Sequence, residues 1–322
     1  MTNQYWNQIE VIKNSNINNL LSSPIELDYR NQYLDVDTYY MSTIMAKLIK
    51  NNKGELYCEI LPFCDQGLVM KTIKFNNPEL LEEIRIEIGG SIIDRIHNKN
   101  NIFNVLRNIY NIRDAQIIPF NCTIGNNYIP ELAYHQIIIF LKFKDVSYLD
   151  KIEDHILTYE IYQTDIDWKN CGMMQNLIQT VQYDSVFFSR NINYVKLNFS
   201  HFLVTHLIIS IDNVDENDID SIDFKLSSKT TGITFTYRWE KNNENILVQK
   251  IYNNYIITFV SKNGNHLQNF QGINFMNSNL SLRINKSTLC EMREDPIFIH
   301  VHTISSNSVR ILNGMLGLRI SK

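Results

Sequence analysis

The stretch Glu83-Ile-Arg-Ile-Glu-Ile-Gly-Gly-Ser-Ile-Ile-Asp-Arg-Ile96 decides the fold class of this chain. Isoleucine alternates with a charged residue up to Gly89-Gly90, and an apolar run resumes directly afterwards. A period of two places the isoleucines on one face of a β-strand, and paired glycines supply the positive φ that a tight turn requires. The stretch predicts an antiparallel hairpin or bulge. A phosphate-binding loop would need a longer glycine pattern that opens a helix.

Short apolar runs of the same kind recur on both sides of this stretch, bounded by Asn, Asp, Gly and Lys. They are typical of an all-β sandwich. The runs are YYMSTIMAKLIK (39–50), GELYCEILPF (54–63), AYHQIIIFLKF (133–143), HILTYEIY (155–162), NYVKLNF (193–199), HLIISI (206–211), GITFTYRWE (232–240), ENILVQKIY (244–252), YIITFVSK (255–262), LSLRI (280–284), IFIHVHTI (297–304) and SVRIL (308–312). Turn residues such as Asn51–Gly54 separate them.

One segment has helical periodicity: Ile102, Phe103, Leu106, Ile109 and Tyr110 recur at the spacing of an apolar helix face, which predicts a short helix over a sheet end. At 322 residues the chain exceeds the usual size of one domain, about 100–150 residues, so we expect two. The polar segment 164–172 ends in Gly and lies near mid-chain. We therefore expect one domain at 1–167 and a second at 173–322.

The composition excludes several classes of protein. A hydrophobic share of 44% is that of a globular protein, and a net charge of -4 offers no positive field for a nucleic-acid backbone. Five cysteines without a CxxC pair indicate neither a disulfide framework nor a zinc knuckle. No apolar stretch approaches the ~18 residues of a membrane span.

Three groups of residues invite a chemical interpretation. His300 and His302 alternate on one strand face and could serve a metal, but no further ligand recurs at the right spacing. The acidic run Asp212–Asp220 fails the calcium-loop template because it lacks the turning Gly and the closing Glu. His135 opens an apolar strand, as structural histidines do, and no G-x-S-x-G or H-E-x-x-H motif is present. We predict no catalytic residue, no cofactor-binding residue and no metal ligand.

Four separated segments, in order, resemble the double jelly-roll major capsid proteins of nucleocytoplasmic large DNA viruses. They are Leu81–Arg95, with its Ile-Gly-Gly turn and Ile-Asp step; Ile118-Pro-Phe with Tyr128–Gln136; Leu177–Gln182 with Leu197-Asn-Phe-Ser-His201; and Gly272-Ile-Asn-Phe275 with Asn307–Leu318, the most specific. Departures are Gln136 where the family prefers Glu, Phe202 for Pro, and Met276-Asn277-Ser278 where an Arg is expected. The chain is also shorter than is usual in the family.

The resemblance implies two consecutive eight-stranded antiparallel jelly rolls, with short helices in the connections. It further implies a structural protein without enzymatic activity or cofactor, in pseudo-hexameric homotrimers that tile an icosahedral shell. Expected partners are neighbouring capsomers, other capsid proteins and an inner viral membrane, with no direct nucleic-acid contact. The expected location is the virion, assembled in the host cytoplasm.

Two alternatives stay open. The short length also suits a minor capsid or assembly-scaffold component. A carbohydrate-binding jelly-roll module is less favoured, because such a module clusters aromatic residues in one set of loops. The three tryptophans, Trp6, Trp168 and Trp239, are widely separated.

Overall fold

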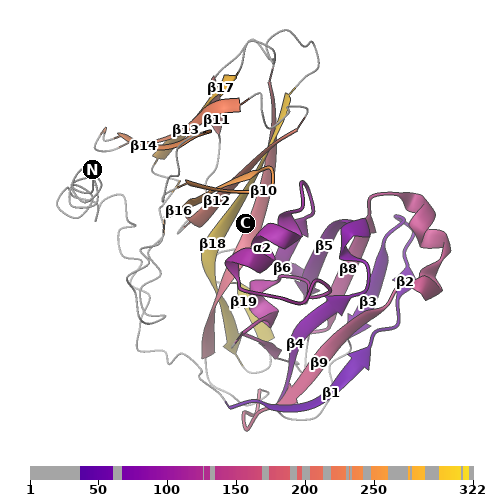
Figure 1. Ribbon diagram of the computed structural model, residues 1–322. Helices are drawn as coiled ribbons and strands as arrows, with labels where there is room; N and C mark the ends of the chain where they lie inside the picture. The colour runs from indigo at the N-terminus through magenta and orange to yellow at the C-terminus, as the bar shows by residue number, and fades with distance from the viewer. Residues whose placement is uncertain are drawn as a thin grey trace. The chain divides into compact units, whose positions relative to one another are not determined.

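A computed structural model describes residues 37–60, 67–125, 127–130, 135–168, 174–188, 194–197, 204–212, 219–229, 232, 234–241, 248–259, 275, 278–286, 297–312 and 315–318 (Figure 1). Antiparallel strands dominate it, which confirms the predicted all-β class. Within these residues, no helix has both the length and the apolar character needed to cross a membrane.

The first jelly roll is built from two antiparallel sheets. Its strands are β1 (Tyr39–Met45), β2 (Ile49–Lys50), β3 (Leu56–Ile60), β4 (Leu68–Phe75), β5 (Leu81–Ile88), β6 (Ser91–His97), β7 (Ile129–Pro130), β8 (Ile137–Phe143) and β9 (Leu157–Gln163). One sheet has the order β1-β9-β4-β7 and the other the order β2-β3-β8-β5-β6. Figure 1 shows β1, β9 and β4 running side by side in the first of these sheets.

The second jelly roll repeats this arrangement. Its strands are β10 (Met174–Phe188), β11 (Tyr194–Leu197), β12 (Val204–Asp212), β13 (Ile219–Ser228), β14 (Thr234–Glu240), β15 (Val248–Ile251), β16 (Asn254–Thr258), β17 (Ser278–Lys286), β18 (Ile297–Leu312) and β19 (Met315–Leu318). The sheets run β10-β18-β12-β16-β15, with β19 on β18, and β11-β17-β13-β14. With β2, β15 and β19 set aside, each roll has eight described strands, which can be numbered one to eight along the chain. In both rolls, one sheet then has the order 1-8-3-6 and the other sheet the order 2-7-4-5. This repeated order confirms two consecutive jelly rolls.

The hairpin predicted at Gly89-Gly90 is present. β5 and β6 pair antiparallel through Gly89 at φ 56° and Gly90 at φ 78°, and Ile88 faces Ser91 across the turn. Both glycines occupy the left-handed region that other residues adopt only with strain. Ile84 and Ile86 are fully buried, as their alternation predicts. A bulge between Ile86 and Glu87 shifts the register of the pair.

The predicted helix is also confirmed as α2 (Ile102–Ile109), with Ile102, Phe103 and Leu106 buried. Further 3-10 turns are η2 (Pro78–Leu80), η3 (Asn121–Thr123), η4 (Val146–Asp150) and η5 (Ile152–Asp154), so short helical pieces do occupy the connections. The core of the second jelly roll includes Phe224, Phe275 and Leu282, all fully buried.

Two features of the strands differ from the sequence expectation. The runs IFIHVHTI and SVRIL, predicted as separate strands, form the single strand β18. Ser305 and Ser306 between the two runs, and Ser308 at the start of the second run, are buried, so these small polar residues continue the strand instead of ending it. Strands β4 and β13 were not predicted, although β4 (LVMKTIKF) carries the apolar residues expected of a buried strand.

Contacts divide the chain into two compact units. One comprises Asp28–Tyr183 and Asn307–Lys322; the other includes Asp184–Ser306. β10 and β18 each begin in one unit and end in the other. The polar segment 164–172 lies between β9 and β10, and its residues 169–172 are outside the described ranges. The domain boundary at 167/173 stays a prediction.

Candidate functional site: a charged sheet face and a polar seam

Charged side chains gather on the outward face of the sheet β2-β3-β8-β5-β6. Strand alternation turns Ile84 and Ile86 into the core and Glu83, Arg85 and Glu87 to the opposite face. The register places Tyr57 opposite Phe140, Phe140 opposite Arg85, and Arg85 opposite Arg95. One row of large side chains therefore crosses four strands.

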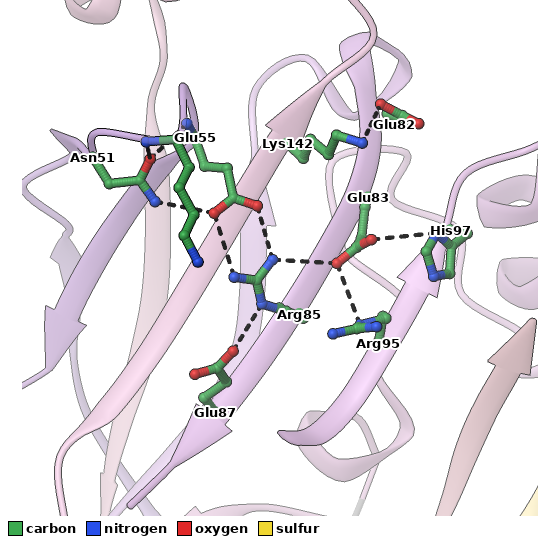
Figure 2. Close-up of polar contacts among 10 residues, drawn as sticks. Asn51, Glu55, Glu82, Glu83, Arg85, Glu87, Arg95, His97 and Lys142 are labelled. Carbon is green, nitrogen blue, oxygen red and sulfur yellow. Dashed lines mark hydrogen bonds and ion pairs between the residues drawn. The ribbon is translucent and has the colours of Figure 1, made fainter. Parts of the chain in front are cut away.

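Arg85 is the centre of this face, as Figure 2 shows. Its Nη1 donates to Glu55 Oε1 at 2.9 Å and to Glu83 Oε1 at 3.3 Å, and its Nε donates to Glu87 Oε1 at 2.8 Å. The guanidinium also stacks on the Phe140 ring, 4.1 Å from its centroid. With side chains only 15% exposed for Arg85 and 12% for Glu55, solvent screens these pairs weakly.

The ionisation of the network follows from these contacts. Burial alone would lower the pKa of Arg85, but the hydrogen bonds to Glu55 and Glu87 outweigh it and raise this pKa. The hydrogen bond from Arg85 lowers the pKa of the Glu55 carboxyl. Arg85 and Glu55 are therefore held in their charged forms, which suits a rigid surface.

The network extends to the edge of the sheet through Glu83. Its carboxylate lies 3.3 Å from Arg95 Nε and 3.3 Å from His97 Nδ1 (Figure 2). Burial lowers the pKa of His97, whose ring also packs against Tyr183 of β10 with centroids 4.6 Å apart. A separate pair joins Lys142 Nζ to Glu82 Oε2 at 2.9 Å.

A second polar arrangement joins the later part of the chain to the first jelly roll. Asp94 Oδ1 accepts from the Val181 N–H at 3.1 Å, and Asn121 Oδ1 accepts from the Gln179 N–H at 2.7 Å. His135 Nδ1 accepts from the Leu316 N–H at 3.4 Å. We call Asp94, Asn121 and His135 the polar seam.

The polar seam fixes backbone positions within one compact unit. Val181 and Gln179 belong to β10 and Leu316 to β19, and their parts of both strands lie in the unit that contains the first jelly roll. Asp94 is only 2% exposed, so loss of its bond would leave buried donors unpaired. All four regions that carry the family resemblance contribute residues to these bonds: Asp94, His135, Gln179 with Val181, and Leu316.

His135 and Gly89, which the sequence analysis treated separately, lie in contact. A Cβ at Gly89 would come within 2.9 Å of the His135 ring. The glycine therefore allows the histidine to lie over the hairpin turn and reach Leu316. This geometry supports the structural interpretation of both residues.

His300 and His302 do share one strand face, where they lie opposite Ser210 and Ile208 of β12. His300 Nε2 lies 2.8 Å from Asp212 Oδ2, and His302 is fully buried. Within the described ranges, no three His, Cys, Asp or Glu side chains gather as a metal site.

Several sequence candidates fall partly or wholly outside the described residues. From the acidic run these are residues 213–218. From the segments that carry the family resemblance they are residues 131–134, 198–201, 272–274 and 313–314. The others are Trp6, Cys64, Cys171 and Cys290. Of the other cysteines, Cys58 and Cys122 are buried and free. Trp168 and Trp239 are buried, at 2% and 8% exposed.

Neither the Arg85 network nor the role of Asn121 was predicted from the sequence. The alternation Glu83, Arg85, Glu87 could have revealed the first, since residues two apart share a strand face. No local signal indicates that Asn121 accepts from Gln179, because the two residues are 58 positions apart.

No protein-family model and no curated protein matches the chain. Among solved structures, it is similar to a chain of the PBCV-1 virus capsid quasi-atomic model, with 14% identity and a TM-score of 0.58 over 92% of this chain and 100% of that one. PBCV-1 VP54, fitted into a reconstruction of the virophage Sputnik, matches with 14% identity and a TM-score of 0.56 over the same shares. At this identity the likeness establishes the fold. The chain has the double jelly-roll fold found in the PBCV-1 virus capsid.

Proposed function

We propose that the chain is a structural subunit of the shell of a large DNA virus. The observation that carries the proposal is the extent of the structural likeness: 92% of this chain superimposes on the whole of a PBCV-1 capsid chain. Both jelly rolls and their shared strand order take part, so the match extends beyond a single sandwich.

The repeated strand order supports a particular assembly. Two similar rolls in one chain give three chains six similar blocks, and closed three-fold association is a common solution for identical subunits. We infer a pseudo-hexameric homotrimer that tiles an icosahedral shell with neighbouring capsomers. The paired charges around Arg85 suit such a block, because they keep a sheet face rigid without a reactive group.

The net negative charge of the chain bears on which partners we infer. A net charge of -4 favours contacts with other capsid proteins and with an inner viral membrane over direct contact with the genome. The inferred location is the virion, after assembly in the host cytoplasm. No enzymatic role is proposed, since the charged groups of the Arg85 network are engaged with one another.

The sugar-binding alternative finds less support. A carbohydrate platform needs exposed aromatic rings grouped in loops, whereas Trp168 and Trp239 are buried. A minor capsid or scaffold role stays a second candidate, because it would use the same fold in a different oligomeric state.

Light scattering coupled to size exclusion, followed by negative-stain imaging, tests the proposal. A mass three times 37.9 kDa with hexagonal outlines is expected. A monomer under all assembly conditions would contradict the trimer and favour the minor or scaffold role, and glycan arrays would then test the sugar-binding alternative.

A further inference from the structure

Strand β1 (Tyr39–Met45) forms an edge of the sheet β1-β9-β4-β7, and among the described residues it pairs only with β9. Its sequence YYMSTIM contains neither a charge nor a proline. The residues Tyr39, Tyr40, Met41 and Met45 are 60%, 57%, 53% and 69% exposed. An edge of this kind presents unpaired backbone groups next to apolar side chains, which is the chemistry that another strand recognises.

The other described sheet edges carry features that block such pairing. β6 contains Asp94, Arg95 and His97; β14 contains Arg238 and Glu240; β10 contains Asp184. β11 and β15 have four residues and a lysine each, and β2 and β7 have two residues, with Lys50 and Pro130. β19 has no charge or proline but only four residues. Charges, prolines, short length and β-bulges are the usual devices against edge-to-edge association. Within the described ranges, β1 is the only edge strand longer than four residues without a charge or proline.

A bulge at Met41 interrupts the pairing of β1 with β9, and regular pairing resumes from Ser42 to Met45. Tyr40 is anchored on the β9 side, where its ring packs edge-on against Tyr162 with centroids 5.5 Å apart. β1 thus carries one device that hinders edge pairing, the bulge, but keeps four regularly paired residues after it.

The segment Asp37-Thr-Tyr-Tyr-Met-Ser-Thr-Ile-Met-Ala-Lys47 is complementary to itself. If two copies run antiparallel with Ser42 opposite Ser42, then Asp37 faces Lys47 of the other copy at both ends. Tyr39 then faces Met45, and Tyr40 faces Ile44. Opposite charges and aromatic–aliphatic neighbours are the cross-strand pairs that stabilise antiparallel sheets.

Asp37 and Lys47 are exposed, and neither makes an ion pair within the described part of the chain. Their charges are therefore available to a second copy. A parallel pairing in the same register would instead place Asp37 against Asp37 and Lys47 against Lys47, which is unfavourable.

We propose that β1 pairs antiparallel with β1 of a second copy about a two-fold axis at Ser42, so that one sheet continues across both copies. This contact is isologous, since the same segment serves on both sides. It goes beyond the proposed function: it would join subunits of neighbouring trimers, and it does not depend on the trimer itself.

Disulfide trapping in the full chain tests the register. Ser42→Cys should give a covalent dimer under mild oxidation, because opposite residues on the axis bring their Cβ atoms within about 5.5 Å. Thr236→Cys, at an exposed position of the edge strand β14, is the matched control and should give only the background of the wild-type chain under the same oxidation.

Charge exchange tests the pairing independently of the cysteine chemistry. Adding Asp37→Lys to Ser42→Cys should reduce the dimer yield about tenfold, since two attractive pairs become repulsive. The further change Lys47→Asp should restore it. A midpoint of thermal unfolding equal to that of the wild-type chain would show that all variants fold.

Equal trapping of Ser42→Cys and Thr236→Cys, or a yield that Asp37→Lys leaves unchanged, would overturn the proposal. Failure of the trimer is separately visible, because light scattering of the unoxidised wild type reports the three-fold mass. A trimeric mass without a disulfide-linked Ser42→Cys dimer would exclude the β1 contact and leave the proposed function intact. A disulfide-linked dimer without a trimeric mass would support the β1 contact and contradict the proposed trimer.

Discussion

The guanidinium carbon of Arg85 lies over the Phe140 ring of the neighbouring strand, 4.1 Å from its centroid, in direct register across the β5–β8 pair. The stacking leaves the edge of the guanidinium directed at Glu55, Glu83 and Glu87 (Figure 2). One side chain thus joins an aromatic surface to three carboxylates that would otherwise repel one another.

Arg85→Ala should lower the free energy of unfolding by about 3 kcal/mol, because three half-buried carboxylates lose their common partner. Arg85→Lys should recover only part of this loss, since an ammonium can neither stack flat nor bond two carboxylates in one plane. Urea unfolding measures both. The control is Lys142→Ala, whose pair with Glu82 is more exposed and should cost about 0.5 kcal/mol. Equal losses for Arg85→Ala and Lys142→Ala would contradict the role given to Arg85.

Gly89→Ala should destabilise the protein more than Gly90→Ala. Both positions have positive φ and should cost about 1 kcal/mol in backbone strain, but only at Gly89 would the new Cβ meet the His135 ring. Thermal unfolding of the two variants gives the difference. In the His135→Ala background the two substitutions should cost the same, and a persistent difference there would show that the ring is not responsible.

Asp94→Ala should lower the free energy of unfolding by about 2 kcal/mol, because the buried Val181 N–H and the partly buried Arg95 N–H lose their acceptor. Hydrogen exchange at Val181 should accelerate in this variant, which reports release of β10 at the seam. Asp184→Ala is the control on the same strand. Among the described residues, this exposed carboxylate accepts only from its neighbour Ser185, and we expect a change within about 0.5 kcal/mol. Unchanged protection at Val181 would argue against the seam.

Stability should fall as the pH drops from about 6.5 to 4, and His206 should account for much of the change. Burial lowers the pKa of this β12 histidine from 6.5 to about 4, so in this window the unfolded chain binds a proton that the folded chain excludes. The contribution of His206 to the free energy of unfolding is fully present above pH 6.5, decreases between pH 6.5 and 4, and is lost below pH 4. The total decrease is on the order of 3 kcal/mol. His206→Asn cannot titrate and should flatten the profile measured by urea unfolding at each pH. An unchanged slope in that variant would exclude His206 as the cause.

The local pattern of the sequence predicted the elements whose structure depends on near neighbours. The hairpin at Gly89-Gly90 and helix α2 lie where alternation and helical spacing place them. The local pattern predicted two strands where the structure has the single strand β18. Serine is common in turns, and the sequence does not show that Ser305 and Ser306 are buried within a continuous strand.

By itself, the sequence determined that this chain is all-β and which faces of its strands are apolar, because these properties repeat every two residues along the chain. It also determined the hairpin turn at Gly89-Gly90, because paired glycines supply the positive φ that such a turn requires. Only the tertiary structure decided which strands are neighbours, and hence that Arg85 meets Glu55 and that Asp94 holds Val181, 87 residues away. It also decided that β1 lies at an edge. Strand pairing is chosen by contacts between distant segments as they bury their apolar faces together, and no short-range pattern records that choice.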